Sequence, residues 1–453
     1  MARAILHADV VAERARLEPA REAILELSSG VRLSYGELDA RADRLAAALS
    51  SSRGLGLAPG DRVAVLAGNQ LRYVELFFAA LRSGLVLVNL NTHLTAVELA
   101  GVIEDSGARA LLYGAGLAER AGAIEAPSLE RRVCLSDDAW LADSAHDPPP
   151  RALRDPEAAC ALIYTSGTTG KPKGVMLPSR MLGFNAVTTV IGWQLRDDDI
   201  TAVFTPLYHA AGFGVFMLPL FCIGGRVVLH RGFDADEVLA TVERERCTVV
   251  LGVPTIFERL AEHPRFASAD LSSLRWVISG GAPLPRYLVD RYAERGVVLK
   301  QGFGMTEAGV NCFTMSCAEA HEKAGSIGRP LPFTEARVVD DAGAPLGPDE
   351  VGRLQLRGPH LFVGYFGDEQ ATAAAFDAEG WFDTGDLART DTDGFFYIAG
   401  REKEMFISGG VNVYPAEVEA ALLAHPAVRD AAVVAVPDAR WGEAGIAAVV
   451  AAP

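Results

Sequence analysis

The sequence lacks the cysteine pattern, the long apolar run and the leader expected of several large protein classes. Its six cysteines are scattered over 453 residues without a CxxC pair, which indicates neither a zinc site nor a disulfide framework. No run of about 18 apolar residues marks a membrane span. The N-terminus has acidic residues and no long apolar core, so it is a poor signal peptide. These absences predict a cytoplasmic protein in a reducing compartment.

Positive charge is also scarce. Lysine and arginine number 42 against 58 acidic residues, giving a net charge of -16. A general surface for nucleic acid or anionic membrane is therefore excluded, and any bound phosphate must be held by a local site. Half of the residues are hydrophobic, which is ample for a large core in a chain of several domains.

A polar loop from Tyr164 to Val175, YTSGTTGKPKGV, follows one apolar run and precedes another. Its glycines let the backbone approach an anion, its hydroxyls donate hydrogen bonds, and its lysines supply positive charge. Pro172 after Lys171 rules out a Walker A loop, and a flexible surface turn is the alternative. The residues suited to phosphate are Thr165, Ser166, Gly167, Thr168, Thr169, Gly170, Lys171 and Lys173.

Strands and helices alternate on both sides of this loop. The pattern predicts a helix from Val10, a hairpin around Ser29–Gly30 and a helix from Gly36 to about Ser50. Strands separated by helices favour parallel sheets, with ligands beyond the carboxyl ends of the strands. The stretch 127–156, rich in proline and aspartate, is interpreted as a connector. The predicted strands are 62–67, 85–90, 108–113, 201–205, 226–230, 247–252, 274–279 and 297–302.

After Arg329–Pro330 the sequence changes to short runs of alternating apolar and polar residues separated by Gly and Pro turns. This pattern predicts a small barrel-like β unit. From Arg401 a turn, a helix from Pro415 and a strand follow. The predicted fold class is α/β: a large N-terminal domain (1–400) of two parallel-sheet subdomains (about 1–160 and 161–330) plus a small β-barrel (331–400). A small, truncated α+β C-terminal domain begins at 401.

Four further clusters carry candidate chemistry. His209 lies in an apolar run after a strand, where a buried core histidine is as common as a functional one. The glycines of SGGAPL (279–284) permit a flat ligand to lie on bare backbone. QGFGMTE (301–307) has Glu307 where a dinucleotide fingerprint needs glycine. This carboxylate suits magnesium, with the Thr306 hydroxyl beside it.

Aromatic and acidic residues complete the set. Phe303 is placed to stack on a purine, although a core role is nearly as good. Asp386, in WFDTGD (381–386), is suited to paired ribose hydroxyls. Asp383 is better interpreted as a turn former.

These motifs, followed by GREKEMFISGGVNVYPAEVE, resemble in order and spacing the adenylate-forming enzymes, which include acyl- and aryl-CoA ligases, luciferases and adenylation domains. The resemblance runs from about Leu33 to the last residue and is most similar to bacterial feruloyl- and fatty-acyl-CoA ligases. It implies a carboxylate, ATP with Mg²⁺, and coenzyme A as ligands. It also implies an acyl-adenylate intermediate and a domain rotation. A homodimer is one expected oligomeric state.

The resemblance implies a role for each matching position. Thr165–Thr169 and Lys173 would hold the ATP phosphates, Glu307 the magnesium, and Thr306 would lie near the α-phosphate. Lys403 would stand at the hinge, and His209 would gate the carboxylate pocket. The residues implied to bind adenine, ribose and the pantetheine arm of coenzyme A are Gly281, Ala282, Gln301, Gly302 and Phe303; Asp386 and Arg401; and Ser408, Gly409 and Gly410.

Two departures from the family pattern qualify this expectation. A lysine in a Gly-Lys motif near the family's C-terminus has no counterpart before Pro453, so we expect a shortened chain or impaired adenylate formation. MLPSR (176–180) replaces a Thr/Ser-His pair. A carrier-protein-loading domain and a non-catalytic nucleotide binder are the alternative functions. The substrate pocket is expected to include His209, Gly214, Val253, Gly281, Gly304 and Val310.

Overall fold

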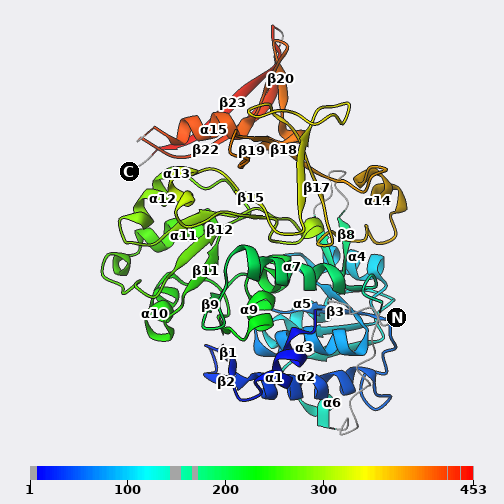
Figure 1. Cartoon of the computed structure of the whole chain (residues 1–453). Helices are drawn as coiled ribbons and strands as arrows, with labels where there is room; N and C mark the ends of the chain where they lie inside the picture. The colour runs from blue at the N-terminus through cyan, green and yellow to red at the C-terminus, as the bar shows by residue number, and fades with distance from the viewer. Residues whose placement is uncertain (1–7, 143–154, 166–171, 426, 439, 452–453) are drawn as a thin grey trace.

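The computed structural model describes residues 8–142, 155–165, 172–425, 427–438 and 440–451. In these residues two large sheets lie side by side with helices between and around them, and smaller β units lie above (Figure 1). The predicted α/β class is confirmed, and all eight strands predicted between residues 62 and 302 are present. Among the described residues, no helix combines the length and apolarity needed to cross a membrane.

The first sheet has the strand order β6-β5-β3-β4-β7-β8. Its strands are parallel except for β7 and β8, which pair antiparallel. Strand β6 falls inside the stretch interpreted as a connector, where proline and charged residues concealed it. The strands are β3 (Arg62–Leu66), β4 (Val86–Asn89), β5 (Ala110–Tyr113), β6 (Arg131–Cys134), β7 (Ala159–Thr165) and β8 (Lys173–Pro178).

The second sheet has the order β13-β12-β11-β9-β10-β1-β2. The predicted hairpin at Ser29–Gly30 joins this sheet, because β1 pairs in parallel with β10. The sheets therefore interleave along the chain, and a subdomain boundary near residue 160 remains a prediction. The strands are β1 (Glu22–Glu26), β2 (Val31–Ser34), β9 (Ile200–Val203), β10 (Arg226–Leu229), β11 (Val249–Gly252), β12 (Trp276–Ser279) and β13 (Leu299–Gln301).

Alternation along the strands explains how the helices pack. In β3, Val63 and Val65 face the core shared by the two sheets, whereas Ala64 and Leu66 face the outer helix α4. Helices α7 and α9 lie between the sheets (Figure 1). The first helices are α1 (Val10–Leu17), α2 (Tyr35–Ser50), α3 (Leu71–Ser83), α4 (Ala96–Ser106), α5 (Ala118–Gly122), α6 (Ala139–Ala142), α7 (Ser179–Gly192), α8 (Ala210–Gly214) and α9 (Met217–Ile223).

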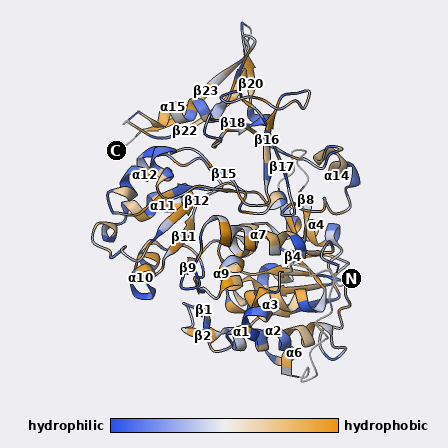
Figure 2. Cartoon of the chain, viewed as in Figure 1, coloured by the Kyte–Doolittle hydropathy of each residue, from blue (hydrophilic) through white to orange (hydrophobic). Residues whose placement is uncertain are grey.

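Helices α10, α11 and α12 cover the other face of the second sheet, where Val238, Phe257 and Leu288 join a buried cluster with the strands. Strands β11 and β12 are coloured mostly hydrophobic in Figure 2, as expected for parallel strands covered on both faces. The remaining helices are α10 (Ala235–Glu245), α11 (Pro254–Glu262), α12 (Arg286–Ala293), α13 (Glu319–Glu322), α14 (Glu369–Ala375) and α15 (Pro415–Leu423).

The β unit after Pro330 is an open antiparallel meander, and the predicted barrel closure is wrong for the described residues. Its order is β16-β17-β18-β19, with β16 and β19 at the two edges. So short a meander cannot curl far enough to close around a packed interior. The strands are β16 (Glu335–Val339), β17 (Gly352–Arg357), β18 (Phe382–Thr390) and β19 (Phe396–Arg401), and a two-strand ladder, β14 (Phe313–Thr314) with β15 (Arg329–Pro330), lies nearby.

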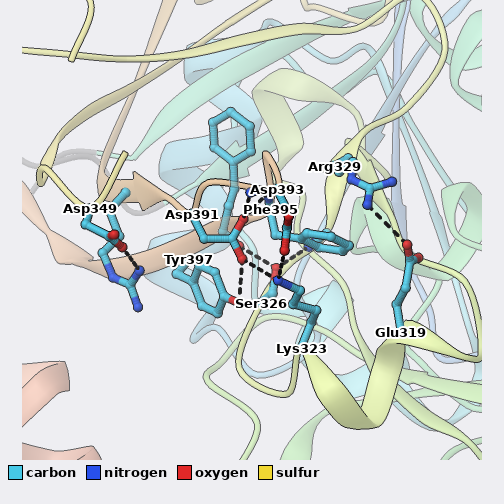
Figure 3. Close-up of polar contacts among 12 residues, drawn as sticks. Glu319, Lys323, Ser326, Arg329, Asp349, Asp391, Asp393, Phe395 and Tyr397 are labelled. Atoms are coloured by element: carbon cyan, nitrogen blue, oxygen red, sulfur yellow. Dashed lines mark hydrogen bonds and ion pairs between the residues drawn. The ribbon is translucent and has the colours of Figure 1, made fainter. Parts of the chain in front are cut away.

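A lysine ties this meander to the domain below. Figure 3 shows Lys323, just after α13, between two carboxylates of the β18–β19 turn. Its Nζ lies 2.9 Å from Asp391 and 2.6 Å from Asp393. Ser326 Oγ donates to the carbonyl of Phe396 at 2.8 Å. These contacts fix the hairpin that carries Asp386 and Arg401.

The chain after Arg401 forms a separate small sheet with the order β21-β20-β23-β22, and α15 packs on β22 (Figure 1, top). The predicted turn, helix and strand are all present. The strands are β20 (Phe406–Ser408), β21 (Val411–Val413), β22 (Val428–Asp438) and β23 (Gly442–Ala451). Its division from residues 1–400 as a mobile domain remains a prediction.

Candidate active site

A cavity of about 840 Å³ opens beyond the carboxyl ends of β9, β11, β12 and β13. This is the edge at which ligands bind in open parallel sheets. The described residues that line it lie between Gly68 and Asn311. Of the six expected pocket residues, Gly214 alone is absent from this lining. A side chain at Gly214 would meet Val310 at 2.5 Å, so this glycine packs behind the wall.

Three of the five expected adenine residues meet the same cavity, and Ala282 and Gln301 are not in its lining. Gly281, Gly302 and Phe303 line it. Gln301 lies beside them, and its Oε1 accepts a hydrogen bond from Leu284 N at 3.2 Å. Gly281 has a φ of +80°, which only glycine adopts readily. Bare backbone at Gly281 and Gly302 leaves room for a flat ring.

Glu307 lies in a short 3₁₀ turn, Thr306–Ala308, between Gly304 and Gly309. The segment folds back tightly: a Cβ on Gly304 would lie 2.2 Å from the carbonyl oxygen of Val310. Glu307 is 7% exposed. Burial raises its pKa, while hydrogen bonds from Tyr365 and Thr165 and the charge of Arg401 oppose the rise. Its Oε1 accepts a long hydrogen bond from Tyr365 Oη at 3.4 Å.

The ends of the predicted phosphate loop converge on Glu307. Thr165 ends β7 and Lys173 begins β8, and the two residues pair across the hairpin. Lys173 Nζ lies 4.9 Å from the ring centroid of Tyr365. The intervening Ser166, Gly167, Thr168 and Thr169 lie outside the described residues. The hairpin therefore delivers a hydroxyl and a cation to one side of the carboxylate.

Tyr365 was not found from the sequence, although it contacts both Glu307 and Lys173. It comes from the loop between β17 and α14, where Phe366 N donates to Gly174 O at 2.7 Å. The only local signal is an aromatic residue after Gly364 in GYFG. Its position depends on long-range pairing with β8.

Asp386 and Arg401 face each other across the β18–β19 ladder. Arg401 Nε lies 2.9 Å from Asp386 Oδ1. Asp386 Oδ2 is buried and has no hydrogen-bond partner among the described residues. Burial raises the pKa of Asp386 to about 6, and Arg401 opposes the rise. An orphaned buried carboxylate oxygen costs free energy until a donor reaches it, which fits a ribose hydroxyl.

Asp383, expected to be a turn former, has that role. Its Oδ1 accepts a hydrogen bond from Gly385 N at 3.0 Å, and its Oδ2 lies 2.5 Å from Arg353. The two acidic residues of WFDTGD therefore have different functions: one builds the bend and the other presents an unpaired oxygen.

His209 lines the cavity at the start of α8. Burial lowers its pKa, and the proximity of His93 lowers it further. The imidazole is therefore neutral at physiological pH and can accept or donate a hydrogen bond in the cavity. The core role considered from the sequence does not describe it, because it lines the cavity.

Lys403 and the turn Ser408–Gly410 lie apart from this lining. Lys403 lies in a 3₁₀ turn, Glu402–Glu404, that joins β19 to β20. Gly409 packs against Trp441, whose ring a Cβ at Gly409 would meet at 2.6 Å. The structure does not bring these residues to the cavity in this arrangement.

Magnesium fits the donor set, although no group of three or more His, Cys, Asp or Glu side chains gathers in the described residues. Mg²⁺ is commonly held by one or two carboxylates together with substrate phosphates. Glu307, beside the phosphate-loop hairpin, offers one such carboxylate.

An alternating fold with a glycine-lined cavity, an Asp–Arg pair suited to ribose and a phosphate hairpin defines an enzyme that activates a substrate with a nucleotide. Residues 11–366 match the family described as AMP-binding enzyme, and residues 417–453 match the AMP-binding enzyme C-terminal domain. The chain belongs to this AMP-binding enzyme family.

Relatives of known function are CoA ligases. A feruloyl-CoA synthase of an Amycolatopsis species is 44% identical over 96% of this chain and 87% of its own. An indoleacetate–CoA ligase of Aromatoleum aromaticum is 36% identical, and the match covers 96% of this chain and 86% of the relative. A long-chain-fatty-acid–CoA ligase of Mycobacterium tuberculosis is 35% identical, and the match covers 97% of this chain and 87% of the relative.

The o-succinylbenzoate CoA synthetase of Bacillus subtilis, solved with its acyl-adenylate intermediate, superposes with a TM-score of 0.88 at 32% identity. It covers 98% of this chain and 88% of its own. The predicted family and the predicted enzyme class, an AMP-forming acid–thiol ligase, are confirmed.

Proposed function

We propose that the protein is an ATP-dependent carboxylate–CoA ligase acting on an aryl acid, such as a hydroxycinnamate, or on a fatty acid. The observation that carries this proposal is the single cavity that joins two unlike sections. One section has the bare glycines suited to adenine, and the other is apolar, formed by Trp193, Val215 and Ile278. His209 lines the same cavity.

Different site residues would bind different parts of the nucleotide. Asp386 would accept hydrogen bonds from the ribose hydroxyls, with Arg401 beside it. Thr165 and Lys173, with the loop between them, would hold the β- and γ-phosphates. Gly281, Ala282, Gln301, Gly302 and Phe303 would enclose the adenine. Glu307 would hold magnesium, which supplies positive charge to the phosphates.

Charge dictates the first step. A carboxylate that attacks the α-phosphorus meets a polyanion, so donors must neutralise charge as it builds. Thr306 and Lys173 would supply two such donors, and loss of one donor of this kind typically costs about 3 to 4 kcal/mol of transition-state stabilisation. Pyrophosphate leaves, and the acyl-adenylate would stay bound in the cavity.

The second step needs other groups. The thiol of coenzyme A attacks the activated carbonyl and AMP departs. Ser408, Gly409 and Gly410 would line the pantetheine arm after rotation at Lys403, which accounts for their distance from the cavity in this arrangement. His209 would gate the passage between the two substrates.

The test supplies ATP, coenzyme A and a panel of benzoates, hydroxycinnamates and fatty acids, and measures AMP and thioester. We expect stoichiometric AMP and CoA thioester from at least one acid, with Lys173→Ala strongly impaired. Adenylate without any thioester would contradict the proposal. Replacement of coenzyme A by a holo carrier protein as the preferred acceptor would support a carrier-loading domain instead.

We also propose a cytoplasmic enzyme that forms homodimers. Support for the first statement comes from the free thiols of all six cysteines. Fractionation of cells and light scattering of the purified protein test these two statements. A monomer at all concentrations would contradict the second.

A further inference from the structure

A buried polar network borders the apolar section of the cavity. Asn185, Thr189 and Asn311 are 3%, 0% and 2% exposed. Asn185 Nδ2 donates to the backbone oxygen of Asn311 at 2.8 Å, and Thr189 Oγ1 donates to the backbone oxygen of Asn185 at 2.6 Å. Asn311 itself lines the cavity. Such a network is costly to build unless its members are satisfied.

The orientation of the Asn311 amide is fixed by its partners. Its Nδ2 donates to Thr189 Oγ1 at 2.9 Å and to the carbonyl oxygen of Val215 at 3.2 Å. A carbonyl can only accept, and the Thr189 proton is already given to Asn185. The atom that faces these two acceptors must therefore be nitrogen.

The Oδ1 atom of Asn311 consequently points away from the network. It receives no hydrogen bond within the described part of the chain, yet it is not one of the polar atoms sealed from solvent. Since the residue is almost fully buried and lines the cavity, this oxygen opens onto the cavity.

The neighbouring wall offers no donor to it. Val215, Ile278 and Val310 are apolar, and Trp193 Nε1 already donates to the carbonyl of Phe313 at 3.0 Å. Trp193 presents an aromatic ring to the cavity. The section therefore combines an apolar, partly aromatic wall with one acceptor whose hydrogen-bonding capacity is unused.

We propose that Asn311 Oδ1 accepts a hydrogen bond from a hydroxyl on the substrate, and that the acid is therefore a hydroxyaryl acid. This inference rests on the proposed ligase function. An alkyl acid would fill this section but displace water from Oδ1 without replacing its hydrogen bond. A site built to pair with a hydroxyl discriminates strongly against the analogue that lacks it, because a buried acceptor is then left unpaired.

The wild-type enzyme provides the first test. Thioester formation is measured with four 4-substituted cinnamic acids carrying OH, NH₂, OCH₃ or H, and with the matching benzoic acids. We expect kcat/KM to be about tenfold or more higher for the two donors, OH and NH₂, than for OCH₃ and H. Equal values for donors and non-donors, or a preference for saturated fatty acids, would overturn the inference.

A variant assigns the effect to one side chain. Asn311→Leu should reduce the OH-to-H ratio of kcat/KM to about one, whatever the change in the absolute rates. Ile278→Val, in the same section, should change both rates but keep the ratio. A folded Asn311→Leu enzyme with the wild-type ratio would contradict the assignment.

The two proposals fail differently. If no acid in the panel gives a thioester, the ligase function itself fails. If acids turn over but donors gain nothing, only the role of Asn311 fails. If Asn311→Leu does not fold, the substrate series on the wild-type enzyme still shows whether a hydroxyl on the acid is recognised.

Discussion

At the scale of single residues, Asp386 shows how a binding group is held at a cost to the unliganded fold. Its carboxyl is 3% exposed, one oxygen is orphaned, and burial raises its pKa to about 6. A raised pKa means that the folded state binds the proton more tightly than the unfolded chain. The contribution of this group to stability therefore falls as pH rises from about 4 to about 6.

We predict that Asp386→Asn has two effects. It removes the free-energy cost of burying a charged carboxylate, and it weakens the binding of nucleotide. Without nucleotide at pH 7, the free energy of unfolding should be unchanged or higher, by up to about 3 kcal/mol. Nucleotide affinity should fall by about tenfold to hundredfold, because a charged acceptor is lost. Denaturant unfolding between pH 4 and 8 and calorimetric titration with ATP measure both. Asp383→Asn is the control and should keep the wild-type affinity, because the Asp383 carboxylate is already paired with Arg353 and Gly385 N.

Glu307 is a second buried carboxylate with a raised pKa, and it lies beside the hairpin that carries Lys173. Residue types and spacing were enough to propose Glu307 and Asp386 as site residues, because each lies in a glycine-rich motif, and the family resemblance added Arg401. They were not enough for Tyr365 and Asn311. Those two carry no local motif, and their partners Lys173 and Thr189 are distant in sequence.

At the scale of elements, the loop from Gly304 to Val310 folds tightly on itself and so fixes the positions of Thr306 and Glu307. Cys312 N donates to Phe303 O at 3.0 Å, which closes the loop at its base. A Cβ at Gly304 would lie 2.2 Å from one backbone oxygen and 2.8 Å from another. Backbone atoms cannot rotate away as a side chain can, so any larger residue must open the loop.

We therefore predict that Gly304→Ala lowers thioester formation by about a hundredfold, because displacing Thr306 and Glu307 by about 1 Å breaks the alignment. Stability should fall by about 1 to 3 kcal/mol. Gly101→Ala is the control: nothing lies within 4 Å of a Cβ there, and α4 should gain about 0.5 to 1 kcal/mol. Full activity in Gly304→Ala would contradict this prediction, because it would show that the loop accepts a larger residue without misaligning Thr306 and Glu307.

Strands were predicted well where apolar runs are uninterrupted, as in 62–67 and 247–252. The pairing of β1 with β10 and the existence of β6 were not, because both depend on contacts between distant segments. The barrel expectation failed for the same reason: alternation predicts strands, whereas closure depends on how many strands meet and how far the sheet curls.

At the scale of the whole molecule, two chemical steps must share one cavity. The turn Ser408–Gly410, which we propose lines the pantetheine arm in the second step, lies outside the cavity lining in this arrangement. The connection between the two parts runs through the short turn Glu402–Glu404. A rotation that serves the second step must change backbone angles here, since the flanking strands β19 and β20 are held by their ladders.

Lys403→Pro tests that rotation. Proline fits the first turn of a helical segment, so the arrangement described here should be retained, but its fixed φ blocks the change. We predict that pyrophosphate exchange stays within about threefold of wild type while thioester formation falls by at least about tenfold. Lys403→Ala, which removes the charge but keeps the backbone free, is the matched control and should form thioester far faster than the proline variant. Equal losses in both steps for Lys403→Pro would mean that the turn supports the site itself and that the molecule does not rotate there.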